Sequence, residues 1–121
     1  MSSEDRARAS RAIVSARANL ALIQDWARTR DLEALRSDTM ARYAVERAFI
    51  ALAAAMRDIP EAIIARHGLP ATLIAGFRNA LAHTYDDIID ERVILTIRED
   101  LPALDRKLEA IQATLDDPPQ G

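Results

Sequence analysis

The chain has 121 residues, enough for one domain with one core, and its net charge of −3 and pI near 5.3 exclude a generally basic nucleic-acid-binding protein. It has no cysteine, which excludes disulfides and zinc–thiolate sites and favours a cytoplasmic location. Half of the residues are apolar and only 3 are glycine, which favours helices over sheets. No run approaches the roughly 18 apolar residues of a membrane span, so no membrane association is expected.

The first predicted helix begins at a cap on Ser2 or Ser3 and runs to about Arg28. Glu4 and Asp5 fall in its first turn, where carboxylates oppose the positive end of the helix dipole. Its apolar residues recur every three to four positions, which predicts one buried stripe: Ile13, Ala16, Leu20 and Ile23.

A second long helix is predicted from a cap at Ser37 or Asp38 to about Arg57, after a brief helical turn or loop at 31–35. Pro60 breaks this helix. Its broad apolar surface comprises Tyr43, Val45, Phe49, Leu52, Ala53 and Met56.

The rest of the chain predicts two further helices. Residues 60–66 are expected to form a short turn, and Gly68 fits a left-handed position that terminates it. A third helix is predicted at about 71–83 and a final one at 90–115, kinked or locally broken by Pro102.

Long helices with short connections predict an all-α fold, an antiparallel four-helix bundle. It is expected to form a single domain over residues 1–115, followed by a flexible C-terminal tail at 116–121.

Charge is distributed unevenly along the chain. Residues 1–58 hold ten arginines against eight acids, whereas residues 86–117 hold four basic residues against ten acids. A basic face in the first half and ordinary solvated helix surfaces both account for this pattern. Any RNA-binding groove is therefore expected to be local and short.

The octapeptide at 78–85, Arg-Asn-Ala-Leu-Ala-His-Thr-Tyr, carries the strongest chemical signal. A guanidinium holds a phosphate by two parallel hydrogen bonds, and an imidazole transfers protons near neutral pH. Arg78 and His83 together supply what cleavage of an RNA phosphodiester requires. Taken singly, Arg78 fits a structural ion pair at the edge of an apolar stripe, and His83 fits helix capping or simple exposure.

A metal site has little support in the sequence. His67 and His83 are the only histidines, and the acids Asp86, Asp87 and Asp90 are more typical of solvated caps than of a cation site. Neither a metal nor another cofactor is expected.

The pattern Arg-x4-His-x-Tyr, in the fuller form Arg-Asn-x-Leu-x-His-x-Tyr, resembles the signature of the HepT-like branch of the HEPN ribonucleases. The resemblance covers about Ile13 to Leu115 and includes the runs at 41–47, 90–93 and 100–104. The sequence departs from the family pattern at 53–55, where alanines replace a stretch that carries a glutamate in many relatives. It also has an alanine after Pro70, where many relatives have a tryptophan.

The resemblance implies a metal-independent endoribonuclease of a toxin–antitoxin pair. His83 would act as general acid or base, Arg78 would bind the scissile phosphate, and Asn79 would orient one of these groups. It further implies a homodimer, in which the motif helices of two subunits form one composite cleft. The partner would be a nucleotidyltransferase antitoxin that silences the toxin by adding AMP to Tyr85. The substrate would be RNA, for instance tRNA or mRNA.

Two other interpretations stay open from the sequence. The same dimeric bundle, without nuclease activity, would be a binding module that regulates a nucleotidyltransferase or binds a nucleotide; the alanines at 53–55 favour it. A plain helical dimer, in which Arg78 forms a structural ion pair, is the second.

Overall fold

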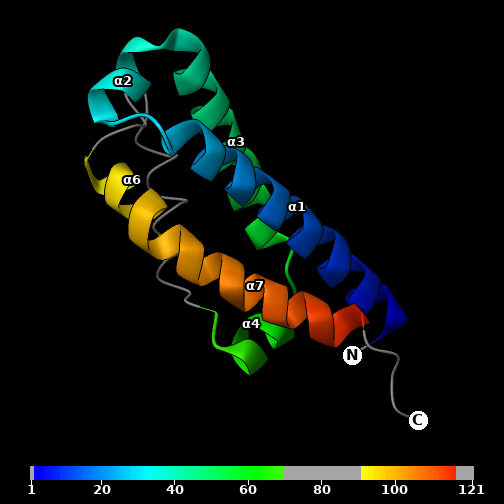
Figure 1. The fold of residues 1–121 in the computed structure, drawn as a ribbon. Coiled ribbons are helices and arrows are strands. Elements are labelled where there is room, and N and C mark those ends of the chain that lie inside the picture. Colours follow the sequence, from blue (N-terminus) through cyan, green and yellow to red (C-terminus); the bar gives the residue numbers. More distant parts are fainter. Residues whose placement is uncertain (1, 70–90, 117–121) are drawn as a thin grey trace.

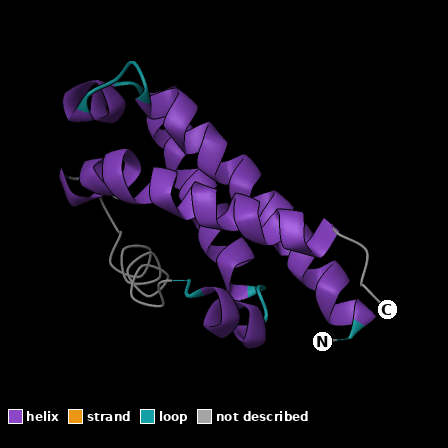
Figure 2. Ribbon diagram, turned by 60° about the horizontal axis from the view of Figure 1, so that its bottom comes forward, coloured by secondary structure: helices purple, strands orange, loops and turns teal. Residues whose placement is uncertain are grey.

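The computed structural model describes residues 2–69 and 91–116, and all regular structure in these two ranges is helical (Figures 1 and 2). The elements are α1 (Ser3–Ala27), α2 (Leu32–Ser37), α3 (Thr39–Arg57), α4 (Glu61–His67), α6 (Glu91–Leu95), the π-helix η1 (Thr96–Asp100) and α7 (Leu101–Asp116). The prediction of an all-α helical bundle is confirmed. No helix in these ranges is both long and apolar enough to cross a membrane.

Three long helical rods dominate the described structure: α1, α3, and the continuous run of α6, η1 and α7 (Figure 1). The third predicted helix, at 71–83, lies outside the described residues. So do residues 117–121 of the predicted tail, whereas α7 itself extends to Asp116.

The start of α1 follows from its capping residue. The Ser2 hydroxyl accepts a hydrogen bond from the backbone N–H of Asp5 at 3.1 Å, which satisfies one of the free N–H groups of the first turn. The helix ends at Ala27, one residue before the predicted end. The predicted apolar stripe is fully buried.

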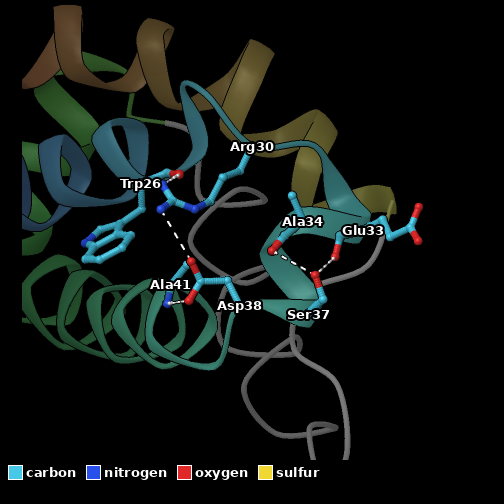
Figure 3. A network of polar contacts seen from close by, with 7 residues as sticks. All are labelled: Trp26, Arg30, Glu33, Ala34, Ser37, Asp38 and Ala41. Atoms are coloured by element: carbon cyan, nitrogen blue, oxygen red, sulfur yellow. Dashed lines mark hydrogen bonds and ion pairs between the residues drawn. The ribbon is translucent and has the colours of Figure 1, made fainter.

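A cluster of polar contacts fixes the corner between α1 and α3 (Figure 3). The Arg30 guanidinium stacks over the Trp26 ring, 5.0 Å from its centroid, and also lies 3.4 Å from the Asp38 carboxylate. The same carboxylate caps α3 by accepting from the backbone N–H of Ala41 at 3.1 Å. One arginine therefore joins the end of α1 to the beginning of α3.

Between these two helices, the predicted turn at 31–35 is a short helix, α2. The Asp31 carboxylate caps it by accepting from the backbone N–H of Ala34 at 2.8 Å. At its other end, the Ser37 hydroxyl donates to the carbonyl of Glu33 at 2.9 Å (Figure 3). Six residues are too few to show a helical hydrophobic period, so only the caps signal this helix.

The Asp38 carboxylate gives the stability of this corner a dependence on pH. The hydrogen bond from Ala41 and the nearby Arg30 charge lower the pKa of Asp38, because both favour its ionised form. The resulting stabilisation is present above the unfolded-state pKa of about 3.9 and disappears as the pH falls through the lower folded-state value.

We therefore expect Asp38→Asn, which retains a capping oxygen but loses the charge, to be less stable than the wild type at pH 7. The difference in urea midpoint should shrink as the pH is lowered below about 3.9. A difference that is unchanged at low pH would show that the charge of Asp38 contributes nothing.

Helix α7 packs antiparallel to α1 through arginines of α1. The Arg17 guanidinium donates to the Asp105 carboxylate at 2.9 Å and to the Gln112 side-chain oxygen at 2.8 Å. The bond to Asp105 raises the pKa of Arg17. Nearer the N-terminus, Arg6 donates to the backbone carbonyl of Leu115 at 2.8 Å. The early part of α1 therefore meets the late part of α7.

The segment between α3 and the motif region also contains a short helix. Residues 61–67 form α4, where only a turn was predicted. Gly68 ends this helix with φ at 63°, and its N–H donates to the carbonyl of Ile64. The predicted left-handed glycine is thus confirmed, and a residue with a Cβ would be strained at this φ.

Pro102 changes the hydrogen bonding of the last rod without interrupting it. Proline has no N–H and its ring clashes with the carbonyl four residues earlier, so a regular α-helical turn cannot precede it unchanged. The chain instead forms the π-helix η1, in which the N–H of Leu101 donates to the carbonyl of Thr96. The predicted local break is therefore a wider turn.

The core of the described structure is aliphatic and alanine-rich, and no polar or charged residue among the described residues is buried. Val45, Leu52 and Met56 of α3 are fully buried as predicted, but Tyr43 is 58% exposed. The apolar surface predicted for this helix is thus wider than the surface that reaches the core.

Candidate functional site

The four predicted site residues, Arg78, Asn79, His83 and Tyr85, all lie outside the described residues. The structure instead describes the segments that precede and follow them, which end at Leu69 and begin at Glu91. Leu69 is buried directly after Gly68, and the carbonyl of Gly68 accepts a hydrogen bond from the Lys107 ammonium at 3.1 Å. The chain before the motif is thereby attached to the middle of α7.

The chain after the motif begins at Glu91, the first residue of α6. Along the last rod, Glu91 and Lys107 are 16 residues apart, which corresponds to about 24 Å at the helical rise per residue. In the sequence, the motif lies between these two segments.

A groove of about 560 Å³ lies on the surface between α1 and α3. Arg8, Arg11 and Ser15 of α1 line one side, and Arg47 of α3 lines the other. Asp58, just after α3, is the one acid among the described residues that line the groove. Alanines of both helices form much of the remaining lining: Ala12, Ala51, Ala54 and Ala55.

The arginines of the groove differ from those that fix the fold. Arg8, Arg11 and Arg47 are exposed, and none of them forms a hydrogen bond or ion pair with another residue in the part of the chain that the structure describes. By contrast, Arg17 and Arg30 bind carboxylates across helix boundaries. Among residues 2–69 and 91–116, the groove therefore presents three guanidinium groups that have no partner.

The outer face of α3 continues this surface beyond the groove. Tyr43, Arg47, Ile50 and Ala54 are spaced by four, three and four residues, which places them on one face of the helix. Tyr43 is 58% exposed, and the guanidinium of Arg42 lies 5.3 Å from its ring centroid. An exposed aromatic ring therefore lies one helical turn from an available arginine.

The sequence indicated a basic first half but not this groove. The i, i+3 spacing of Arg8 and Arg11 places them together on α1, and that signal is readable from sequence. Arg47 joins them only through the register of α1 against α3, which no local pattern reveals.

Residues 2–69 and 91–116 contain no candidate metal site, because no three His, Cys, Asp or Glu side chains in these ranges lie close enough together to hold an ion. The acids Asp86, Asp87 and Asp90 lie outside these ranges.

Comparison with protein families identifies the chain. The family model described as Ribonuclease HepT-like matches residues 16–111, which is 96 of the 121 residues. The chain belongs to the Ribonuclease HepT-like family. No curated protein and no solved structure gives a significant match.

The HepT-like match confirms the family that the octapeptide predicts. It spans α2, α3, α4, α6 and η1 together with residues 78–85, so the scaffold and the motif belong to one family unit. Arg47 falls within the matched range, whereas Arg8 and Arg11 precede it.

Proposed function

We propose that this HepT-like chain is a metal-independent endoribonuclease, the toxin of a toxin–antitoxin pair. The observation that carries the proposal is the family match across 16–111, which contains the octapeptide with Arg78, Asn79 and His83. The family name supports RNA as the substrate, and the side chains of the octapeptide supply the chemistry.

The proposed reaction is a transesterification within the RNA strand. The imidazole of His83 in one subunit takes the proton of the ribose 2′-hydroxyl, and the oxygen attacks the adjacent phosphorus. The bond from phosphorus to the 5′-oxygen breaks, and that oxygen receives a proton from the imidazolium of His83 in the second subunit. The products are a 2′,3′-cyclic phosphate and a 5′-hydroxyl.

Arg78 binds the scissile phosphate and stabilises the negative charge that builds on its free oxygens. Asn79 orients the phosphate or the imidazole by a hydrogen bond. Because each chain has one motif histidine and the reaction uses both a base and an acid, the proposal includes a homodimer with a composite site.

Control of this site is proposed to act through Tyr85. A cognate nucleotidyltransferase antitoxin transfers AMP from ATP to the Tyr85 hydroxyl, which loses its proton as pyrophosphate leaves, and the added phosphate competes with the RNA phosphate for Arg78. Intact-mass measurement of the purified protein shows whether the tyrosine carries AMP.

A second candidate function, a non-catalytic regulatory partner of a nucleotidyltransferase, is favoured by one feature of α3. Ala53 and Ala55 are buried and Ala54 is half-buried, so this turn has no carboxylate to orient a polar group of the site. RNA cleavage that is lost in His83→Ala supports the ribonuclease. Binding of a nucleotidyltransferase by a folded dimer that cleaves no RNA supports the regulatory partner.

A further inference from the structure

The groove between α1 and α3 gathers positive charge. Arg8, Arg11 and Arg47 line it without a partner among the described residues, and Asp58 is the single acid among the described lining residues. Asp58 leaves a net excess of two positive charges among the lining residues. Three like charges in one groove repel each other, so a bound anion would stabilise the arrangement.

The residues that line the groove suit an extended anionic chain. Small side chains line it beside the arginines, among them Ala51 and Ala54. Guanidinium groups bind phosphate oxygens by paired hydrogen bonds, and Ser15 adds a hydroxyl donor at the wall. Several phosphates in a row would engage both walls at once.

The exposed ring of Tyr43 adds a feature that the binding of phosphate groups alone would not require. Proteins that bind single-stranded nucleic acids combine a basic groove along the backbone with aromatic side chains on which bases stack. Tyr43 lies on the same face of α3 as Arg47, one turn away, and more than half of it is exposed.

We propose that the α1–α3 groove binds single-stranded RNA, with backbone phosphates on Arg8, Arg11 and Arg47 and a base stacked on Tyr43. The inference rests on the proposed ribonuclease function for the identity of the nucleic acid. It adds a substrate-binding surface on the scaffold, apart from the octapeptide, and so predicts that part of the affinity for RNA comes from outside the motif.

The charges of this face argue against a second copy of the chain as its occupant. In a two-fold symmetric dimer the same surface patch of each subunit forms the contact. A dimer centred on this groove would bring six arginines and two Asp58 carboxylates together, and this excess of like charge disfavours association. RNA supplies the opposite charge.

The test measures binding of a fluorescent single-stranded RNA of about 12 nucleotides, a length within the range that such surfaces cover. The RNA carries 2′-O-methyl groups throughout, so it lacks the nucleophile of the proposed reaction and stays intact. Binding is compared for the wild type, a variant with Arg8→Gln, Arg11→Gln and Arg47→Gln, and a control with Arg66→Gln, Arg98→Gln and Arg106→Gln. The control removes three exposed arginines of α4, η1 and α7 and changes the net charge equally.

Loss of three phosphate contacts should reduce the slope of log affinity against log salt by about 2, because each contact with a single strand contributes about 0.7. Between 50 and 200 mM salt, the wild-type affinity should therefore fall about 20-fold more than that of the groove variant. The slope for the control variant should differ from the wild-type slope by less than about 0.7, the contribution of one phosphate contact.

Stacking on Tyr43 is tested by Tyr43→Ala in the same assay, with Met40→Ala as control. Met40 is 73% exposed and lies one turn before Tyr43 on α3. Loss of a stacked base should weaken binding at least about 5-fold with little change in the salt slope. Met40→Ala should bind like the wild type.

Equal losses in the groove and control triples, or no loss in the groove triple, would overturn the proposal. So would a groove triple that keeps the RNA affinity but changes the oligomeric state in sedimentation, because the groove would then be a contact between copies. If the wild type cleaves no unmodified RNA but shows the predicted binding pattern, the ribonuclease proposal fails while the RNA-binding groove stands.

Discussion

His83→Ala is expected to lower the rate of RNA cleavage by at least about 10²–10⁴-fold, the usual contribution of one positioned general acid or base. In the composite site each subunit supplies one imidazole, so the substitution removes both the base and the acid from the homodimer. Alanine cannot transfer a proton, and water would have to replace both groups. The measurement is the initial rate of cleavage of a labelled RNA under single-turnover conditions.

His67→Ala is the matched control, because the chain contains only these two histidines. His67 is the half-buried last residue of α4, and the proposed mechanism gives it no role. The His67→Ala variant should cleave RNA at close to the wild-type rate. Equal loss of activity in the two variants, with both folded, would contradict the assignment of His83.

Leu20→Ala is expected to destabilise the protein by about 2–5 kcal/mol, because it empties space in a closely packed core. Leu20 is only 1% exposed and lies in the buried stripe of α1. For a chain of this size, such a loss corresponds to a decrease in Tm of roughly 10 °C or more. Thermal unfolding followed by circular dichroism measures this change.

Leu22→Ala provides a control with the same chemical change two positions along the same helix. Leu22 is 49% exposed, and alanine is at least as good a helix former as leucine. We therefore expect a loss below about 1 kcal/mol. If Leu22→Ala cost as much as Leu20→Ala, the side of α1 assigned to the core would be wrong.

Local hydrogen bonding explains which parts of the fold were predictable from the sequence. Ser2, Asp38 and Gly68 act through bonds to residues three or four positions away, so the residue type alone signals the end of a helix. The buried stripe of α1 follows equally directly from its spacing. The short helix α2 was predicted as a brief helical turn or loop and α4 as a short turn, because six or seven residues do not display a period.

Contacts between distant segments explain the rest. The cation–π contact of Arg30 with Trp26 and its ion pair with Asp38 depend on how the chain turns between α1 and α3. The groove depends on the register that sets Arg47 opposite Arg8 and Arg11. Tyr43 belonged to the predicted apolar surface of its helix but is exposed, because that surface is wider than the core contact of α3.

The candidate site also has a part that was recognisable from the sequence and a part that was not. The octapeptide was recognisable because the four candidate site residues stand within eight positions, and the family match across 16–111 bears out the family they indicate. The roles of Arg78, Asn79, His83 and Tyr85 stay predictions, since these residues lie outside the described ranges.

The measurement that tests the central claim most directly is the analysis of fragment ends after cleavage of labelled RNA by the purified protein in EDTA. Intact mass first establishes that Tyr85 carries no AMP. The proposed mechanism predicts cleavage without a metal ion and fragments that end in a 2′,3′-cyclic phosphate and a 5′-hydroxyl. Fragments with 3′-hydroxyl and 5′-phosphate ends, or no cleavage by the folded and unmodified dimer, would contradict it.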